Sequence, residues 1–482
     1  MDSLTFIVSS FSGALRLLIQ ADAEVLAILW LSLKIAVVST VGATLVAIPI
    51  AWHIHLAGPR WRYLFSLLFQ VLAAIPTVII GTVCFLLLSR NGPLGALELL
   101  YTPTAIIVGD LLLAIPLVAL FLISALSLVP KGIFDTARNL GAHRLQLVRV
   151  VFNECREALL IAVCTAFGRV VSEVGAAMIL GGNIRGVSRT MTTAISLEIG
   201  KGETELSIAL GLILLGAALA NAFLIGHAQY FVEKFRHRDL TPVSSAPTSD
   251  TKSLFPANRT PPTARLTALS KSFANPLFQN LTFELPLEGG TSLQGRSGCG
   301  KTTLFRLLAG LETPDTGTIE VTGRVVLVFQ RPYLFHGSVA DNLLFPSRLR
   351  GMAHDEAIDS ALRLARSLEI AHLLSHPVRH LSAGEAARAS FGRALAAQPD
   401  LLLIDETLVH LDAESLKPIC ATLEKFVASG GRFVLTTHQP SMALQLCHHH
   451  LFLADGRLIE VQGADLQHDT PSVETPIVPK VM

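Results

Sequence analysis

Residues 295–302 read Gly295-Arg-Ser-Gly-Cys-Gly-Lys-Thr302, which is a complete match to the pattern GxxxxGK[ST]. The strand-like residues 291–294 precede this stretch, and the helix-forming residues 303–308 follow it. In a strand–loop–helix of this kind, backbone N–H groups and the positive end of the helix surround phosphate groups. The stretch therefore predicts a phosphate-binding loop in an α/β nucleotide-binding domain.

The expected nucleotide contacts of this loop extend one residue beyond the pattern. Lys301 is expected to reach the β- and γ-phosphates, and the Thr302 hydroxyl is expected to bind Mg²⁺. The full set is Gly295, Arg296, Ser297, Gly298, Cys299, Gly300, Lys301, Thr302 and Thr303. ATP and Mg²⁺ are accordingly the predicted ligands.

Two carboxylates follow a second apolar run further along the chain. Residues 401–404 are Leu-Leu-Leu-Ile, a pattern typical of a buried strand, and Asp405 and Glu406 come directly after them. A carboxylate at the end of such a strand can hold the metal, and its neighbour can polarise the attacking water. Asp405 is the predicted metal ligand, and Glu406 is the predicted catalytic base.

The order of apolar and amphipathic segments in the second half of the chain is typical of a sheet covered by helices. Short apolar runs at 325–329, 401–404 and 433–435 alternate with longer amphipathic segments, as in a largely parallel sheet. Proline and serine are dense in 239–262, which predicts a flexible linker. We expect an α/β domain over 263–466 and a disordered tail over 467–482.

The first half of the chain has a different composition. Overall, 51% of the residues are hydrophobic, 16% are charged and the mean hydropathy is +0.53, which excludes an ordinary soluble enzyme. The net charge of +1 provides no field for nucleic acid. Five apolar stretches are long enough to cross the lipid bilayer, and they lie at 25–52, 63–89, 111–130, 158–180 and 206–232. Residues 1–238 are therefore predicted to form an all-α membrane domain, with 4–20 as an interfacial helix.

Lysine and arginine are distributed unequally between the two sides of these stretches. One set of connecting loops and flanks carries ten of them and the opposite set carries five. Because cytoplasmic loops retain the excess of positive charge, the first set is expected inside and the N-terminus outside. The linker and the nucleotide-binding domain then lie on the cytoplasmic side of a multi-pass membrane protein.

Several further motifs in the second half resemble those of ATP-binding cassette (ABC) ATPases. Leu381-Ser-Ala-Gly-Glu385 resembles the LSGGQ signature, and Gln330, Asp412, His438 and Phe273 stand where the family has its Q-loop, D-loop, switch histidine and adenine-stacking aromatic residue. The resemblance implies that His438 assists Glu406 and that Gln330 joins Thr302 and Asp405 at Mg²⁺. It also implies a homodimer, in which Ser382, Ala383, Gly384 and Glu385 face the partner's phosphate loop.

The chain departs from the family pattern at two places. Ala383 replaces the first signature glycine, and a Cβ there would cost about 1–2 kcal/mol if the position required a positive φ. Because Gly384 is kept, we expect slower closure rather than an inactive site, and an increased turnover in Ala383→Gly if Ala383 strains the loop. Residues 407–412 read Thr-Leu-Val-His-Leu-Asp in place of the family's PTSALD, so communication through the D-loop is expected to differ.

The loop between the third and fourth stretches resembles the EAA loop of binding-protein-dependent ABC importers. Asp135, Ala137 and Gly141 occupy the motif positions, with Asp135 in place of the usual glutamate. The resemblance implies a short cytoplasmic helix that docks on the cassette near the Q-loop. An ABC exporter, the first alternative, would have six long spans and no such loop.

Residues 172–186 and 190–198 resemble permeases for tetrahedral oxyanions, first the tungstate type and then the molybdate type. The resemblance implies ATP-driven import of an oxyanion, most readily tungstate, delivered by an extracytoplasmic binding protein. Molybdate or sulfate import and a membrane-anchored regulatory ATPase without transport are the alternatives. Glu173 within a span would cost about 3 kcal/mol unless it is paired, and Arg169 is its expected partner. The two residues either line the pathway or hold helices together.

Overall fold

The computed structural model describes residues 3–228, 230, 254–255, 261–273, 275–331, 333–408, 411–437 and 439–462. Three expectations therefore lie wholly or mostly outside the described residues. They are the catalytic candidate His438, the expected linker except 254–255 and 261–262, and the expected tail at 467–482.

The chain forms two compact units that do not follow the order of the sequence. One unit contains residues 1–129 and 151–237, and the other contains residues 130–150 and 238–482. The segment 130–150 lies between two parts of the helical unit in sequence, yet its contacts place it with the nucleotide-binding domain. Each unit is therefore described by itself.

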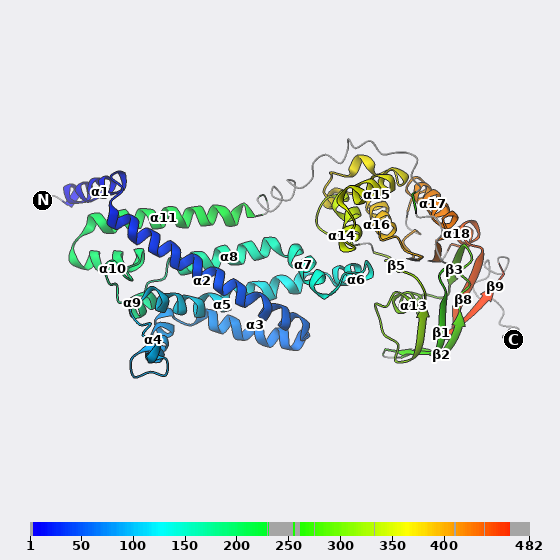
Figure 1. Cartoon of the computed structure of the whole chain (residues 1–482), viewed down its shortest axis with the longest axis horizontal. Helices are drawn as coiled ribbons and strands as arrows, with labels where there is room; N and C mark the ends of the chain where they lie inside the picture. Colours follow the sequence, from blue (N-terminus) through cyan, green and yellow to red (C-terminus); the bar gives the residue numbers. More distant parts are fainter. Residues whose placement is uncertain are drawn as a thin grey trace. The chain divides into compact units, whose positions relative to one another are not determined.

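The described part of the helical unit contains no strand (Figure 1). Its helices are α1 (Ser3–Ile19), α2 (Ala23–Leu56), α3 (Pro59–Ala74), α4 (Thr77–Leu88), α5 (Pro103–Leu128), α8 (Arg156–Val171), α9 (Gly175–Gly181), α10 (Met191–Lys201) and α11 (Thr204–Gly226), with a short 3₁₀ turn at Gly95–Leu97. The expected all-α membrane-type domain is thus confirmed.

The membrane-type helices are of two kinds. Among the described residues, α2, α5 and α11 are each long and apolar enough to cross a bilayer. Two further pairs, α3 with α4 and α8 with α9, pass the same test together but are bent by 88° and 59°. Counting each bent pair as one span brings the number up to five. The first bend has a local cause, because Pro76 restricts Ile75 to an extended conformation and ends α3.

Helices α2 and α5 pack side by side in the same direction (Figure 1). Ile35, in the first half of α2, packs with Ile106 near the start of α5, and further along a Cβ at Gly42 would lie 3.0 Å from Leu111. The residue numbers of these contacts increase along both helices, so the helices are parallel, and α2 and α5 begin at the same end of the unit. Residue 130, where the segment that joins the other unit begins, follows the opposite end of α5.

The second unit consists of two sheets and covering helices. Its strands are β1 (Ala264–Ser272), β2 (Pro276–Glu284), β3 (Gly290–Gln294), β4 (Thr316–Val321), β5 (Val325–Val328), β6 (Leu401–Asp405), β7 (Arg432–Thr436), β8 (His449–Ala454) and β9 (Arg457–Val461). Its helices are α6 (Lys131–Asn139), α7 (Arg144–Glu154, shared with the helical unit), α13 (Lys301–Leu308), α14 (Val339–Leu349), α15 (His354–Ser367), α16 (Ala383–Ala396), α17 (Ala413–Ala428) and α18 (Pro440–Leu446), with 3₁₀ turns at Ala371–Leu373 and Val378–His380. The expected α/β domain is confirmed.

The larger sheet positions the nucleotide site. Its strand order is β5-β6-β7-β3-β8-β9, and all pairs are parallel except β8 with β9. The smaller antiparallel sheet has the order β2-β1-β4. A buried core that includes Leu293, Phe305 and Leu403 joins β3, α13 and β6. Parallel strands bring their carboxyl ends to one edge, so the segments after β3, β6 and β7 meet there.

Candidate nucleotide site and coupling segment

The phosphate-binding loop connects β3 to α13. Gly300 is the N-cap of α13 and has a φ of +109°, a conformation that residues with a Cβ rarely adopt. A Cβ at this position would also lie 2.9 Å from Leu277 and Phe278. The loop therefore turns directly into the helix, whose first N–H groups have no partner within the helix itself.

Lys301 is held over this loop. Its side chain is 5% exposed, and Nζ donates hydrogen bonds to the carbonyl oxygens of Gly295 at 2.8 Å and Arg296 at 3.2 Å. The same Nζ lies 3.8 Å from a carboxylate oxygen of Glu406. The structure thus brings the predicted phosphate-binding lysine close to the predicted base.

Asp405 is the last residue of β6 and is almost completely buried. Its Oδ1 accepts a hydrogen bond of 2.9 Å from the Thr436 hydroxyl at the end of β7, and its side chain also bonds to Thr302. Burial raises the pKa of Asp405, and the two threonine hydrogen bonds oppose that rise. Asp405 therefore faces the loop threonine that was expected to share a metal with it.

Glu406 begins the loop after β6 with a φ of +49°. The Thr436 hydroxyl also accepts the Glu406 backbone N–H at 2.8 Å, which fixes this turn. Gln330 Nε2 donates to the Glu406 carboxylate at 2.9 Å. Four residues from three separate segments consequently form one cluster at the carboxyl edge of the sheet: Lys301, Gln330, Asp405 and Glu406.

Phe273 lies outside this cluster and presents an open aromatic face. The residue is 64% exposed, and Lys271 Nζ lies 5.3 Å from the centroid of its ring. Lys271 is itself held by Glu312 at 3.0 Å and Asp315 at 3.3 Å. These contacts support an exposed ring of the kind on which a base could stack.

The signature residues begin α16. Ser382 is the N-cap, and it forms a capping box with Glu385 in which the Ser382 N–H donates to the Glu385 carboxylate at 2.8 Å. Ala383 is the first helical residue and is not among the residues with positive φ. The expectation that its Cβ strains this position is therefore wrong, because the residue has ordinary helical geometry.

The second signature glycine is required for a different reason. A Cβ at Gly384 would lie 2.2 Å from the Ser415 hydroxyl at the start of α17. Ser415 is fixed there because Asp412 caps α17 by accepting its N–H at 2.9 Å. This hydrogen bonding lowers the pKa of Asp412. The beginnings of the signature helix and the D-loop helix are thus in direct contact.

The segment 130–150 docks on the same domain through α6. Asp135 forms an ion pair of 2.8 Å with Arg306 of α13. Asn139 Nδ2 donates to the Leu327 carbonyl at 2.7 Å, and the Leu327 N–H donates to Asn139 Oδ1 at 2.8 Å. Ala137 is fully buried, and Gly141 follows the helix with a φ of +92°.

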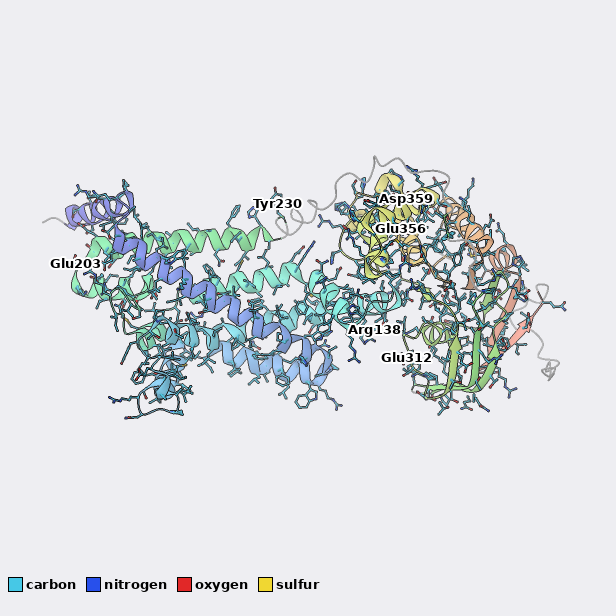
Figure 2. All side chains as sticks on the ribbon, in the orientation of Figure 1. Arg138, Glu203, Tyr230, Glu312, Glu356 and Asp359 are labelled. Carbon is cyan, nitrogen blue, oxygen red and sulfur yellow. The ribbon has the colours of Figure 1, made fainter. Side chains whose placement is uncertain are left out.

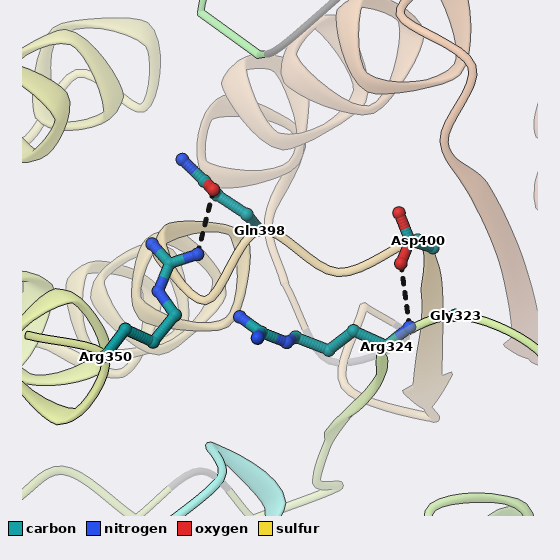
Figure 3. A pocket seen from close by; sticks show the side chains of 5 residues that line it. All are labelled: Gly323, Arg324, Arg350, Gln398 and Asp400. Atoms are coloured by element: carbon teal, nitrogen blue, oxygen red, sulfur yellow. Dashed lines mark hydrogen bonds between the residues drawn. The ribbon is translucent and has the colours of Figure 1, made fainter. Parts of the chain in front are cut away.

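A second contact links the segment to the signature helix. Gln146 Nε2 donates to the Leu349 carbonyl at the end of α14 at 3.2 Å. The next residue, Arg350, donates to Gln398 Oε1 at 2.8 Å and to the last carbonyls of α16, and Arg324 donates to the Ala397 carbonyl at 2.7 Å. Figure 3 shows both arginines at the pocket lined by Gly323, Arg324, Arg350, Gln398 and Asp400. The two arginines that line the pocket thus cap the carboxyl end of the signature helix with positive charge.

The sequence reasoning missed Asn139, Gln146, Arg306 and the arginine cap. Asn139 and Gln146 flank the Gly141 of the motif, but their spacing carried no information about a partner. Arg169 and Glu173 lie in the helical unit, with 3.8 Å between their charged groups and with side chains 46% and 3% exposed. Glu173 also accepts the Ala176 N–H at 3.1 Å.

Comparison with known proteins finds a different family in each half of the chain. Residues 43–234 match the family described as "binding-protein-dependent transport system inner membrane component", and residues 278–409 match the family described as "ABC transporter". The tungstate uptake system permease protein of Peptoclostridium acidaminophilum is 38% identical over 217 residues, which cover 45% of this chain and 95% of that protein. This chain belongs to the ABC transporter family.

Two further relatives match this ABC transporter. The tungstate uptake system permease protein of Campylobacter jejuni is 36% identical over 46% of the chain and 92% of its own length. The tungstate uptake system ATP-binding protein of P. acidaminophilum is 33% identical over 38% of the chain and 90% of its own length. The ABC transporter thus combines a permease domain and an ATP-binding ATPase domain in one multi-pass membrane chain.

Proposed function

We propose that this ABC transporter imports a tetrahedral oxyanion, tungstate before molybdate or sulfate, across the bacterial cytoplasmic membrane. The observation that carries the proposal is that two proteins of one tungstate uptake system match the chain, a permease at 38% identity and an ATP-binding protein at 33%. The chain works as a homodimer, and an extracytoplasmic binding protein delivers the anion. The ATPase domain lies on the cytoplasmic side, where ATP is available.

Hydrolysis in this proposal uses the cluster at the carboxyl edge of the sheet. The loop 295–303 binds the phosphates, Phe273 stacks on adenine, and the partner's Ser382, Ala383, Gly384 and Glu385 complete each site. Glu406 accepts a proton from the attacking water, and His438 assists it. Thr302, Gln330 and Asp405 offer the oxygen ligands that suit Mg²⁺, which would neutralise phosphate charge. The buried Asp405 carboxyl and its Thr302 contact fit such a role.

The docked segment transmits closure of the cassettes to the helices. Asn139 hydrogen-bonds to the edge strand β5, Asp135 forms an ion pair with α13 directly after the phosphate loop, and Gln146 hydrogen-bonds to the end of α14. Because these elements carry the nucleotide cluster and adjoin the signature helix, their movement displaces 130–150 as one body. A purely regulatory membrane ATPase would not need this docking.

Uptake by proteoliposomes tests the proposal. Wild-type chain with a tungstate-loaded binding protein and ATP should accumulate tungstate, with molybdate and sulfate as competitors. Glu406→Gln should abolish accumulation and still bind ATP, which shows that it is folded. ATPase activity indifferent to binding protein and anion would contradict import and support the regulatory alternative.

A further inference from the structure

Five charged side chains form a linked cluster where α2 begins in the helical unit. Glu24, in the first turn of α2, pairs with Arg185 and with Arg189, both from the connection between α9 and α10. Arg189 also pairs with Glu198 at 3.3 Å, and Lys201 pairs with Glu198 at 3.0 Å. Three cations therefore share two carboxylates within this cluster.

Arg189 is buried, but not all of its N–H groups have hydrogen-bond partners among the described residues. The residue is 9% exposed, and both of its carboxylate contacts are made by Nη1, at 3.4 Å to Glu24 and 3.3 Å to Glu198. Its Nε is buried and has no hydrogen-bond partner among the described residues. An unpaired buried donor is unfavourable, and a guanidinium binds tetrahedral or planar anions best through two N–H groups. Arg189 therefore has unused capacity for an anion.

Glu24 occupies the place that an anion would take. One of its carboxylate oxygens contacts Arg185 and the other contacts Arg189, so the carboxylate bridges two guanidinium groups. Glu24 is partly exposed, and Asp22 caps its helix independently by accepting the Glu24 N–H at 2.9 Å. A carboxylate carries a single charge, whereas a tetrahedral dianion carries two charges and four acceptor oxygens.

We propose that Arg185 and Arg189 are an anion-recognition pair of the permease domain, and that Glu24 fills it until an oxyanion dianion displaces the carboxylate. This inference rests on the proposed function for its ligand class. The cluster lies at the end where α2 and α5 both begin, opposite the end of α5 that leads to residue 130. In the proposed topology that end faces outward, where the binding protein releases the anion.

Ligand-dependent thermal stability of the purified full chain tests the pair without transport or a binding protein. A ligand that binds the folded state raises Tm with its concentration, so sodium tungstate is titrated at constant ionic strength against sodium chloride. Glu24→Gln should lower the half-maximal tungstate concentration, because the competing carboxylate is gone. Arg189→Gln and Arg185→Gln should raise it about tenfold or more, with Arg189→Lys between them and wild type.

The glutamate variant and the arginine variants should change the half-maximal tungstate concentration in opposite directions if the cluster recognises an anion, but not if it only holds helices together. If the cluster only ties α2 to α10, Glu24→Gln and Arg189→Gln will both lower the Tm without ligand and leave the tungstate dependence unchanged, which would overturn the inference. Arg90→Gln, at an exposed arginine of another loop, is the matched control and should leave the dependence unchanged. If the wild-type chain takes up tungstate but neither arginine affects tungstate binding, only this inference is contradicted. If tungstate binding depends on the arginines but the chain shows no uptake, only the proposed function is contradicted.

Discussion

Asn139 pairs with Leu327 as an additional strand would. The side-chain amide donates to the Leu327 carbonyl at 2.7 Å and accepts its N–H at 2.8 Å. Leu327 lies in β5, which is the edge strand of the six-stranded sheet. An edge strand has unpaired backbone groups, and here a single amide from the docking helix satisfies two of them.

Asn139→Ala should uncouple the transporter. Leu327 would be left with a buried N–H and a buried carbonyl, each costing about 1–3 kcal/mol when unpaired. We expect uptake and binding-protein-stimulated ATPase to fall about tenfold or more, with ATP binding retained. Arg138→Ala on the same helix is the control, since Arg138 is exposed (Figure 2). Equal losses in both variants would contradict a specific role for the amide.

The ion pair between Asp135 and Arg306 should tolerate an exchange of its two charges. Both side chains are about one quarter exposed, at 25% and 28%, so the pair contributes about 0.2–1 kcal/mol. Asp135→Arg and Arg306→Asp should each reduce the coupling of ATPase activity to uptake, because like charges then face each other. The double exchange should recover most of the coupling ratio. No recovery in the double variant would show that the two residues act separately.

Gly384→Ala should impair the signature helix by collision. The new Cβ would meet the Ser415 hydroxyl at 2.2 Å, whereas Ser415 Cβ is 3.2 Å away. We expect lower ATPase activity and a lower Tm, and a partial recovery of both when Ser415→Ala removes the hydroxyl. Ser415→Ala alone is the control. A double variant as impaired as Gly384→Ala would mean that the contact does not limit this position.

Ala383→Gly should not accelerate turnover. Ala383 has helical geometry at the start of α16, so glycine removes no strain and weakens the helix by up to about 1 kcal/mol. The expected result is an unchanged or reduced ATPase rate with a slightly lower Tm. A higher rate would indicate that this position adopts another conformation during the catalytic cycle.

Asp405→Asn should stabilise the nucleotide-free protein at neutral pH and abolish hydrolysis. Burial raises the pKa of Asp405, so folding disfavours its charged form. Stability is therefore lost as pH rises from the ordinary pKa of the carboxyl through the raised value. Asparagine removes that loss, so the Tm difference from wild type should be larger at pH 7.5 than at pH 4.5. Glu320→Gln, at an exposed strand position, should show no such pH dependence.

Short-range features of the sequence were sufficient for much of the fold. The glycines and Lys301 of the phosphate-binding loop, the carboxylates after residues 401–404, and the long apolar stretches each depend on neighbouring residues only. Their backbone geometry and hydrophobic periodicity are local, so the α/β ATPase domain and the helical membrane domain were predictable. The resemblance of residues 135–141 also identified the docking helix.

Other properties depended on segments that meet only in the folded chain. Tertiary structure decided that Asn139 of the docking helix pairs with β5, and that two apolar stretches are sharply bent. It also decided that Ser415 leaves no room for a Cβ at Gly384, and that Ala383 carries its Cβ without a positive φ. Glu24 and Arg189 are 165 residues apart, and no local pattern predicts such a pair. The sequence determined which chemical groups the protein has, and long-range packing determined which of them touch, because strand register and helix contacts depend on the whole core.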